Sequence, residues 1–426
     1  MATGDLVTSA IRHRCSGSRP SSAVVTVGTE LTTGLRQDTN SGEIACALTA
    51  AGYAVVETSS VPDELDAVSA LLARLVAGVD LVITTGGLGP THDDITREAA
   101  AAALGLTMSR DSGIEASLAR LASRHAEPDA VAQLTRQADV LSGATVIAPT
   151  TGTAPGQIVP TARGDLVMLP GPPAEMRPML ASTLAGLAAP GREPNRILAV
   201  VGLPESDVQV RVQRALTGTS DVGFTVLARL GEVHAVLSDE GAGATGLAQA
   251  AARARTEIGD ACFSDDGSSL AEVVLAGARE AGMTLGTAES CTGGMVAASL
   301  TDVAGASDVF AGAVVCYSNA VKTSMLGVPA MLISGHGAVS SEVATAMARG
   351  ARTALACDLA VAVTGVAGPG GGSADKPVGT VWFAIADADR AYSELRELGG
   401  DRVTVRARAT VHALDMLRRR LAKMAE

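Results

Sequence analysis

The segment DLVITTGGLGPTHDD, residues 80–94, places a strongly apolar run directly before a glycine-rich loop. Its first six residues have the composition of a buried strand, and the glycines let the backbone turn sharply and approach a ligand closely. Four elements of alternating strand and helix character precede it, over residues 23–27, 41–51, 53–57 and 64–77. This alternation predicts an α/β domain with a doubly wound parallel sheet.

The same alternation occurs again from residue 270 onward, and the stretch between the two patterns resembles a small α+β module. A chain of 426 residues is too long for one ordinary core. We therefore predict an α/β protein with two three-layer domains joined by that module. The expected parts are a disordered leader (1–20), a first domain (21–189), the module (190–264) and a second domain (265–426), with a flexible junction at Asp265–Ser269.

The composition narrows the classes of function. The formal net charge of −12 gives no general basic surface, so nucleic acid is not an expected partner. No apolar run reaches membrane-spanning length and six cysteines lack CxxC spacing, so we expect a cytoplasmic protein with reduced thiols. Only three of the 33 basic residues are lysines, namely Lys322, Lys376 and Lys423. Because lysine can lose its proton and arginine cannot, such a lysine is a candidate base.

A candidate nucleophile, Ser290, lies in the segment AESCTGG, residues 288–294, where a strand pattern gives way to a helix. The first N–H groups of a helix have no partner within it, so the amides near Thr292 and Gly293 are candidate donors to an oxyanion. Ser290 could instead cap the helix, and the local sequence favours neither role.

Two further segments follow later strand patterns. Lys322 ends the segment YSNAVK, residues 317–322, and a glycine-rich loop begins at residue 364. By itself Lys322 could be a surface lysine and the loop only a turn. However, a serine, a lysine and a glycine loop at the ends of successive strands would meet at one edge of the sheet and form one active site.

These segments, with GHGAVS (335–340) and TGVAGPGGGSADKPVGTVWF (364–383), resemble the C-terminal domain of the competence/damage-inducible protein A (CinA) family. The resemblance covers residues 269–422. It implies an amidohydrolase that converts nicotinamide mononucleotide to nicotinate mononucleotide and ammonia by a Ser/Lys mechanism. It also implies a homodimer and no cofactor for this domain.

The resemblance assigns roles to individual residues. Ser290 is expected to be the nucleophile, Lys322 the base, and Tyr317 a residue that relays or orients the proton. The main rival nucleophile is Cys291, which would need a histidine partner such as His336. The remaining oxyanion and substrate contacts are expected at Thr292, Gly293, Asn319, Thr364, Gly365, Gly368, Gly371 and Arg402.

The N-terminal half carries a second candidate site. Five loop segments compose it: GTEL (28–31), QDTN (37–40), GGLGPTHDD (86–94), GTAPG (152–156) and LPGPP (169–173). Glycines and amides at a helix start suit a phosphate and carboxylates suit a divalent ion, although acids there can also simply favour the helix. These segments resemble the molybdopterin-binding fold as used in CinA proteins over residues 22–187, which implies ADP-ribose pyrophosphatase activity.

The expected nucleotide contacts of this site are Gly28, Glu30, Asn40, Gly86, Gly87, Gly89, Thr91 and Gly171. A divalent metal (Mg, Mn or Co) is expected at Asp38, Asp93 and Asp94. Thr135 and Thr150 stand where the family pattern predicts asparagine, and the loop at residues 141–142 lacks a proline. Ligand binding without turnover is therefore the alternative for this half.

The middle segment, with GLPES at residues 202–206, resembles the small KH-like module of the family but has no basic GXXG loop for RNA. Two other functions remain open: a molybdopterin-related binding or processing protein, and a non-catalytic competence or DNA-damage adaptor. Ammonia release from nicotinamide mononucleotide would separate them from the amidase.

Overall fold

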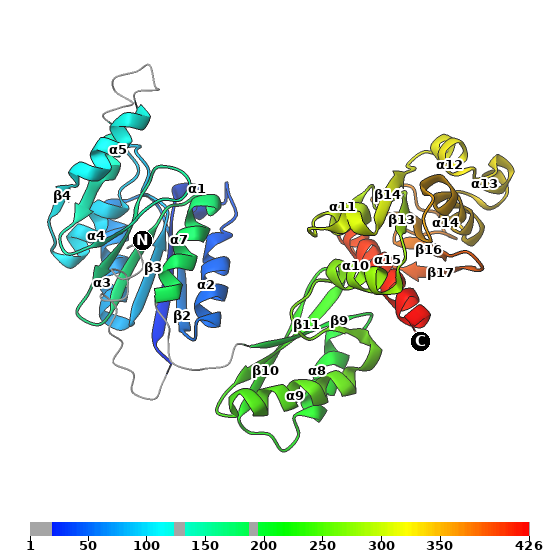
Figure 1. The fold of residues 1–426 in the computed structure, drawn as a ribbon, viewed down its shortest axis with the longest axis horizontal. Helices are drawn as coiled ribbons and strands as arrows, with labels where there is room; N and C mark the ends of the chain where they lie inside the picture. Colours follow the sequence, from blue (N-terminus) through cyan, green and yellow to red (C-terminus); the bar gives the residue numbers. More distant parts are fainter. Residues whose placement is uncertain (1–18, 123–132, 187–194, 426) are drawn as a thin grey trace. The chain divides into compact units, whose positions relative to one another are not determined.

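The computed structural model describes residues 19–122, 133–186 and 195–425, and the chain divides into two compact units, Met1–Pro194 and Asn195–Glu426 (Figure 1). Residues 1–18 of the predicted leader and the predicted boundary at residues 189–194 lie outside the described residues. Among the helices of the described part, none is long and apolar enough to cross a bilayer.

A six-stranded sheet with the order β2-β1-β3-β8-β7-β6 forms the centre of the first unit. Its strands are β1 (Ser21–Val27), β2 (Ala54–Val61), β3 (Leu81–Thr85), β6 (Thr145–Ile147), β7 (Gly156–Pro160) and β8 (Asp165–Leu169). β2, β1, β3 and β8 run parallel, whereas β7 is antiparallel to both of its neighbours. The turn from β7 to β8 is closed by a hydrogen bond from the Thr161 N–H to the Gly164 carbonyl, and so short a connection permits only antiparallel pairing.

Side chains of this sheet alternate between two faces, and helices cover both. Val25 and Val82 belong to the core under α3 and α4, whereas Val24 and Ile83 belong to the core under α2 and α7. The helices are α1 (Thr29–Thr32), α2 (Asn40–Ala50), α3 (Leu65–Gly78), α4 (Thr96–Leu104), α5 (Ser112–Ala122), α7 (Pro173–Gly186) and the 3-10 turn η1 (Arg136–Ala138). A separate antiparallel pair joins β4 (Met108–Arg110) to β5 (Asp139–Leu141).

The second unit begins with the α+β module, an antiparallel sheet of order β10-β11-β9-β12. Its elements are β9 (Arg196–Val201), α8 (Glu205–Ala215), β10 (Val222–Ala228), β11 (Glu232–Asp239), α9 (Gly243–Ile258), η2 (Gly259–Ala261) and β12 (Cys262–Ser264). Alternate residues of β11 (Val233, Ala235 and Leu237) are buried in a core shared with both helices. Alternation of this kind is typical of a sheet covered on one face.

A five-stranded sheet of order β14-β13-β15-β16-β17 follows. Its strands are β13 (Leu285–Glu289), β14 (Phe310–Val315), β15 (Leu359–Gly365), β16 (Thr380–Ala386) and β17 (Ala391–Glu397). The first three in the order are parallel, and β16 and β17 are antiparallel additions. The surrounding helices are α10 (Leu270–Ala281), α11 (Met295–Thr301), η3 (Ala306–Asp308), α12 (Asn319–Leu326), α13 (Ala330–His336), α14 (Ser341–Leu355) and α15 (Arg402–Ala425).

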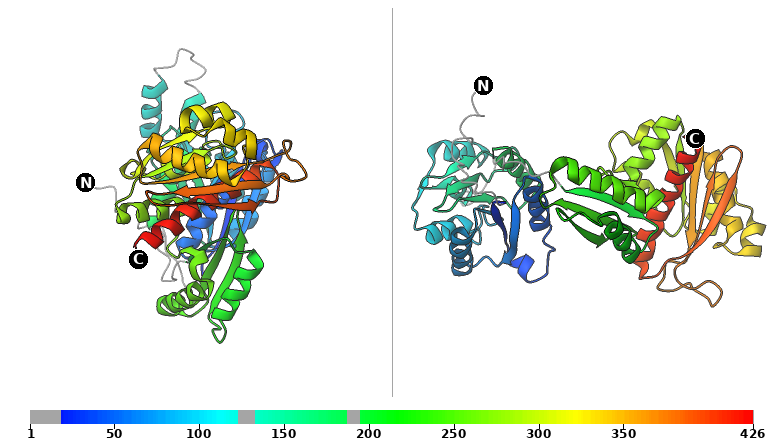
Figure 2. Two further views of the ribbon diagram at one scale, coloured as in Figure 1. Left: turned by 90° about the vertical axis from the view of Figure 1, so that its right-hand side faces the viewer. Right: turned by 90° about the horizontal axis from the view of Figure 1, so that it is seen from below.

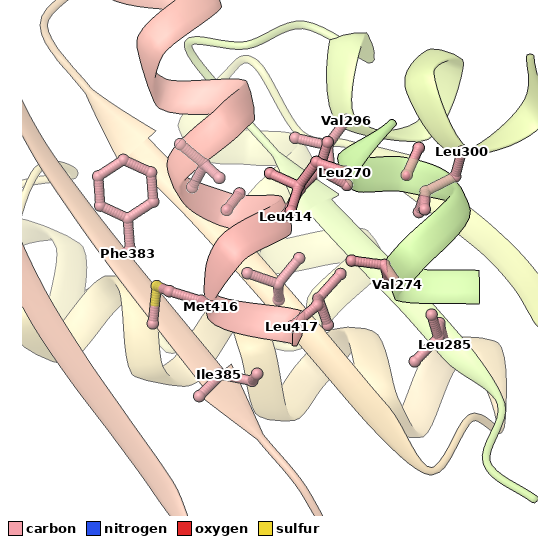
Figure 3. Close-up of a cluster of buried hydrophobic side chains, with 14 of the residues drawn as sticks. Leu270, Val274, Leu285, Val296, Leu300, Phe383, Ile385, Leu414, Met416 and Leu417 are labelled. Atoms are coloured by element: carbon pink, nitrogen blue, oxygen red, sulfur yellow. The ribbon is translucent and has the colours of Figure 1, made fainter. Parts of the chain in front are cut away.

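The two faces of this sheet carry side chains of different size. Val361 and Phe383 lie on the face that packs against α10, α11 and α15 (Figure 3). Ala360 and Ala362 lie on the opposite face, where small side chains let α14 approach the strands closely. Figure 2 (left) shows the strands between α15 in red and the yellow helices α12–α14. The predicted three-layer α/β fold is therefore confirmed, although the antiparallel direction of β7 and β16 was not predicted.

The predicted junction at Asp265–Ser269 leads directly into α10. Ser269 and Glu272 form a capping box at the start of that helix. Val201 and Phe263 of the module belong to the same apolar cluster as α10 and α15. The module and the C-terminal domain therefore share buried surface, and the domain boundary at residue 264 stays a prediction.

Candidate active site

Three parallel strands bring the predicted catalytic segments to one edge of the C-terminal sheet. Ser290 follows β13, Lys322 lies in α12 after β14, and the glycine loop follows β15. The carboxyl ends of parallel strands lie at the same edge, which is why segments far apart in sequence meet there.

Ser290 and Lys322 are in direct contact. The Lys322 ammonium group donates a hydrogen bond to the Ser290 hydroxyl (3.1 Å) and another to the Cys316 carbonyl (2.9 Å). Lys322 is only 1% exposed, and no carboxylate of the described residues pairs with it. Burial consequently lowers the pKa of Lys322 from its ordinary value. This lysine has the environment of a base, and the surface-lysine alternative is wrong.

Ser290 does not cap a helix. α11 begins five residues later, and its cap position is held by Gly294, which makes no side-chain cap bond of its own. The Ser290 N–H donates to the Val363 carbonyl (2.9 Å), which fixes the end of β13 against β15. The Ser290 hydroxyl is thus bonded to Lys322 and to no helix N–H group.

The neighbouring residue Glu289 accepts hydrogen bonds from backbone N–H groups that would otherwise have no acceptor at the start of α11. Its carboxylate is fully buried and accepts hydrogen bonds from the N–H groups of Gly294 (2.9 Å), Val296 (3.1 Å) and Ala297 (2.8 Å). These three N–H groups are therefore not available to an oxyanion. Among the described residues this corrects the expectation of unpaired helical donors for all but Met295, the first residue of α11.

The backbone N–H groups of the two predicted oxyanion residues, Thr292 and Gly293, differ in their hydrogen bonds. The Gly293 N–H donates to the Ser290 carbonyl (3.1 Å), so in this structure it is not a free donor. Among the described residues the Thr292 N–H donates to no backbone carbonyl, but it faces the neighbouring Cys291 thiol, a weak acceptor that a substrate oxygen could replace. Arg406 of α15 holds this turn, because its guanidinium donates to the carbonyls of Cys291 (3.1 Å) and Thr292 (2.8 Å).

The rival pair of Cys291 and His336 is not supported. Cys291 is 5% exposed within the apolar core, and burial raises the pKa of its thiol to about 11. The His336 ring lies 3.4 Å from the Glu342 carboxylate. A thiol with so high a pKa is almost entirely protonated near neutral pH and is a poor nucleophile.

Tyr317 and Arg402 form a second cluster at the same site. Arg402 donates to the Tyr317 hydroxyl (3.1 Å) and to the Gly368 carbonyl (2.7 Å), and so connects α15, the segment after β14 and the glycine loop. Tyr317 is 62% exposed, and its hydroxyl contacts Arg402 and not Ser290. Asn319 is exposed at the first position of α12. Proton relay through Tyr317 stays a prediction.

The remaining predicted residues of the glycine loop have structural contacts. The Thr364 hydroxyl donates to the Ala338 carbonyl (2.8 Å), and a Cβ added to Gly365 would lie 2.7 Å from Val381. Gly368 and Gly371 both adopt a φ of +83°, which favours glycine. Thr364 and Gly365 therefore shape the site, and Gly371 lies exposed on the loop.

The N-terminal candidate residues also meet. A cleft of about 450 Å³ at the carboxyl edge of the first sheet is lined by every residue predicted for that site. These are Gly28, Glu30, Asp38, Asn40, Gly86, Gly87, Gly89, Thr91, Asp93, Asp94 and Gly171. Arg97, which is 1% exposed, supports the glycine loop from below by donating to the carbonyls of Leu88 (2.7 Å) and Gly89 (3.1 Å).

Two of the three predicted metal ligands are bonded to groups of the protein itself. Asp94 accepts from the N–H groups of Gly89 (2.8 Å) and Thr91 (2.8 Å), and so closes its own loop. Asp38 accepts from the Thr26 hydroxyl (2.9 Å) and from the Ser41 N–H (3.0 Å). In the described part of the chain, no three His, Cys, Asp or Glu side chains are grouped as metal ligands. A loop-closing role explains Asp94 better than a metal does.

Known proteins resemble both halves of the chain. Family models match the CinA C-terminal domain over residues 267–421 and a probable molybdopterin binding domain over residues 23–189. A CinA-like protein of Citrifermentans bemidjiense is 41% identical over 94% of this chain and 97% of its own. A CinA-like protein of Mycobacterium sp. (strain MCS) is 42% identical over 93% and 98%. The chain belongs to the CinA family.

A solved CinA-type structure also matches. The competence/damage inducible protein CihA from Agrobacterium tumefaciens is 41% identical over 36% of this chain and 93% of its own, with a TM-score of 0.35. Two residues that hold the turn around Ser290 were not predicted, namely Glu289 and Arg406. Glu289 lies inside a segment that carried the resemblance, whereas Arg406 lies outside all of those segments.

Proposed function

We propose that the C-terminal domain hydrolyses the carboxamide of nicotinamide mononucleotide and releases ammonia. The observation that carries the proposal is the 3.1 Å contact between the Ser290 hydroxyl and a buried lysine that has no carboxylate partner in the described chain. A serine hydroxyl is a weak nucleophile until a neighbouring base removes its proton, and a neutral lysine can do so.

The reaction would proceed in two balanced stages. Neutral Lys322 takes the Ser290 proton while the oxygen attacks the carboxamide carbon, and Lys322 then returns the proton to the departing ammonia. The resulting ester is attacked by water, whose proton passes to Lys322 and then back to Ser290. The Thr292 N–H is the predicted donor for the oxyanion of both stages.

Arg402 is suited to the phosphate of the nucleotide. Within the described residues its guanidinium pairs with no carboxylate, and it is bonded only to the Tyr317 hydroxyl and the Gly368 carbonyl. Arginine binds phosphate with two parallel hydrogen bonds, so exchange of these neutral partners for a phosphate would be favourable. Tyr317, which contacts Arg402, would then orient the bound substrate.

Ammonia release from nicotinamide mononucleotide by the purified full chain tests this proposal. Ser290→Ala is the matched negative control, and free nicotinamide tests the need for the phosphate. Wild-type protein with no ammonia release above the Ser290→Ala background would refute it.

For the N-terminal domain we propose the binding of a nucleotide diphosphate such as ADP-ribose. Support comes from the observation that all eleven predicted residues line the same cleft. Titration with ADP-ribose measures binding, and release of AMP measures cleavage. Tighter binding of a molybdopterin precursor than of ADP-ribose would favour the molybdopterin-related alternative.

A further inference from the structure

A buried glutamine at the N-terminal cleft has no hydrogen-bond partner. Gln137 lies in η1, is 1% exposed and lines the cleft, yet its carbonyl oxygen is buried without any donor. Buried polar atoms in native proteins are nearly always bonded, so an exception at a cleft points to a bond made with a ligand.

A second buried glutamine of the same domain provides an internal comparison. Gln157 is fully buried in β7, accepts from the Leu141 N–H (3.0 Å) and donates to the Asp139 carbonyl (2.9 Å). It does not line the cleft. Gln157 therefore makes the hydrogen bonds expected of a structural glutamine. Gln137 is equally buried, but its carbonyl oxygen makes no such bond.

We infer that the Gln137 carboxamide recognises the adenine of a nucleotide bound in the cleft. A carboxamide presents an acceptor beside a donor, and adenine presents the complementary 6-amino donor beside a ring-nitrogen acceptor. The last side-chain torsion of glutamine is soft, so a small rotation turns both atoms toward the ligand. This inference rests on the nucleotide binding proposed for the N-terminal domain.

The test compares wild-type protein with Gln137→Met and Gln157→Met in the full chain. Calorimetric titration gives the Kd for ADP-ribose and for its analogue with unsubstituted purine, which lacks the 6-amino donor. Wild-type protein should bind ADP-ribose about tenfold more tightly than the analogue, because one neutral hydrogen bond is lost. Gln137→Met should bind both ligands equally.

Thermal unfolding separates a ligand contact from a structural one. Gln137→Met removes no internal bond, so its Tm should equal or exceed that of the wild type, whereas Gln157→Met should unfold at a lower temperature. Equal wild-type affinities for the two ligands, or a Tm loss in Gln137→Met matching that in Gln157→Met, would overturn the inference. If wild-type protein binds neither ligand, the proposed N-terminal function fails, and the Tm comparison still decides whether Gln137 is structural.

Discussion

The C-terminal site and the N-terminal cleft differ in what their polar side chains are bonded to. In the C-terminal site, Glu289 and Arg406 hold the turn around the nucleophile, and Ser290 is left in contact with Lys322. In the cleft, Asp38 and Asp94 are bonded to the loops that carry them. In the first site the neighbours of Ser290 hold the turn, whereas in the second the predicted metal ligands themselves make the bonds that hold the loops.

The charges differ as well. The C-terminal site presents Lys322, Arg402 and Arg406, and its one nearby carboxylate, Glu289, is enclosed by helix N–H groups. The lining of the cleft has six carboxylates (Glu30, Asp38, Asp63, Asp93, Asp94 and Glu175) against a single arginine, Arg36. The first site favours an anionic substrate directly, whereas a diphosphate in the second would have to lie against the glycine-loop N–H groups, away from these carboxylates.

The largest expected effect is in the C-terminal site, where Lys322→Arg keeps the charge but removes the base. Arginine stays protonated at any working pH, so kcat for ammonia release should fall about 10²–10⁴-fold. Ser290→Ala should lose activity to a similar extent, and the double variant should lose little more, since both residues act as one unit.

Steady-state kinetics on nicotinamide mononucleotide, with circular dichroism as a folding control, checks this expectation. A Lys322→Arg protein that keeps more than a tenth of its activity would assign Lys322 a purely electrostatic role. Lys322 would then not act as a base, and the C-terminal site would differ from the N-terminal cleft mainly in its charge.

The next effect is the pH dependence of the amidase. Burial lowers the pKa of Lys322. In the proposed mechanism only its neutral amine takes the Ser290 proton. The rate should therefore rise with pH, about tenfold per unit below that pKa, and level off before the ordinary lysine range. Between the lowered and the ordinary pKa the unfolded chain binds more protons, so this group makes the free energy of unfolding rise with pH.

A profile of kcat/KM against pH from 5 to 10 measures the rise. A rate that falls through the same range would point instead to a protonated Lys322 as the active form. Nicotinate mononucleotide formation should be followed at saturating and at low substrate, because kcat and kcat/KM report different states of the enzyme.

A smaller effect is expected in the cleft from Asp94→Ala. The change removes the acceptor of the Gly89 and Thr91 N–H groups, so the loop loosens and ADP-ribose should bind about tenfold more weakly. Asp93→Ala, at a residue whose side chain is 58% exposed, is the matched control and should bind nearly normally.

Calorimetric titration with EDTA and again with Mg²⁺ distinguishes the two roles of Asp94. A loop-closing residue matters equally under both conditions. A defect confined to the Mg²⁺ titration would identify Asp94 as a metal ligand. The cleft would then resemble the C-terminal site in having a side chain that acts on the ligand.

The smallest expected effect is that of Cys291→Ala. The thiol lies in the core and its raised pKa keeps it protonated, so kcat should stay within about threefold of wild type. Ammonia assays on Cys291→Ala and Ser290→Ala, run in parallel, check this. An inactive Cys291→Ala beside an active Ser290→Ala would move the nucleophile by one residue.

The strand and helix periods were enough to predict both α/β sheets and the edge at which Ser290 and Lys322 meet. They predicted β16 as a strand but not its direction, and they did not predict β6, β7 or β17. Strand direction depends on the length and path of the connections, which hydrophobic period does not report.

The functions of single side chains were harder to predict than their positions. Glu289 ends a strand, and from sequence a carboxylate there looks like a solvated residue. Its bonds to α11 depend on the turn that only the folded chain shows. Gln137 gave no signal at all, since it lies outside every glycine segment, and only its missing hydrogen bond distinguishes it.

The carboxylate of Glu289 also bears on which nucleophiles this scaffold could accept in evolution. The start of a helix normally lowers the pKa of a nearby thiol through its partial positive charge. Here a buried negative charge already faces that helix end, so the stabilisation is largely cancelled. In a Ser290→Cys protein the helix end would therefore contribute little to forming a thiolate, and Lys322 would be the group that takes the thiol proton. On this scaffold a change of nucleophile would thus depend on retaining the lysine and not on the start of the helix.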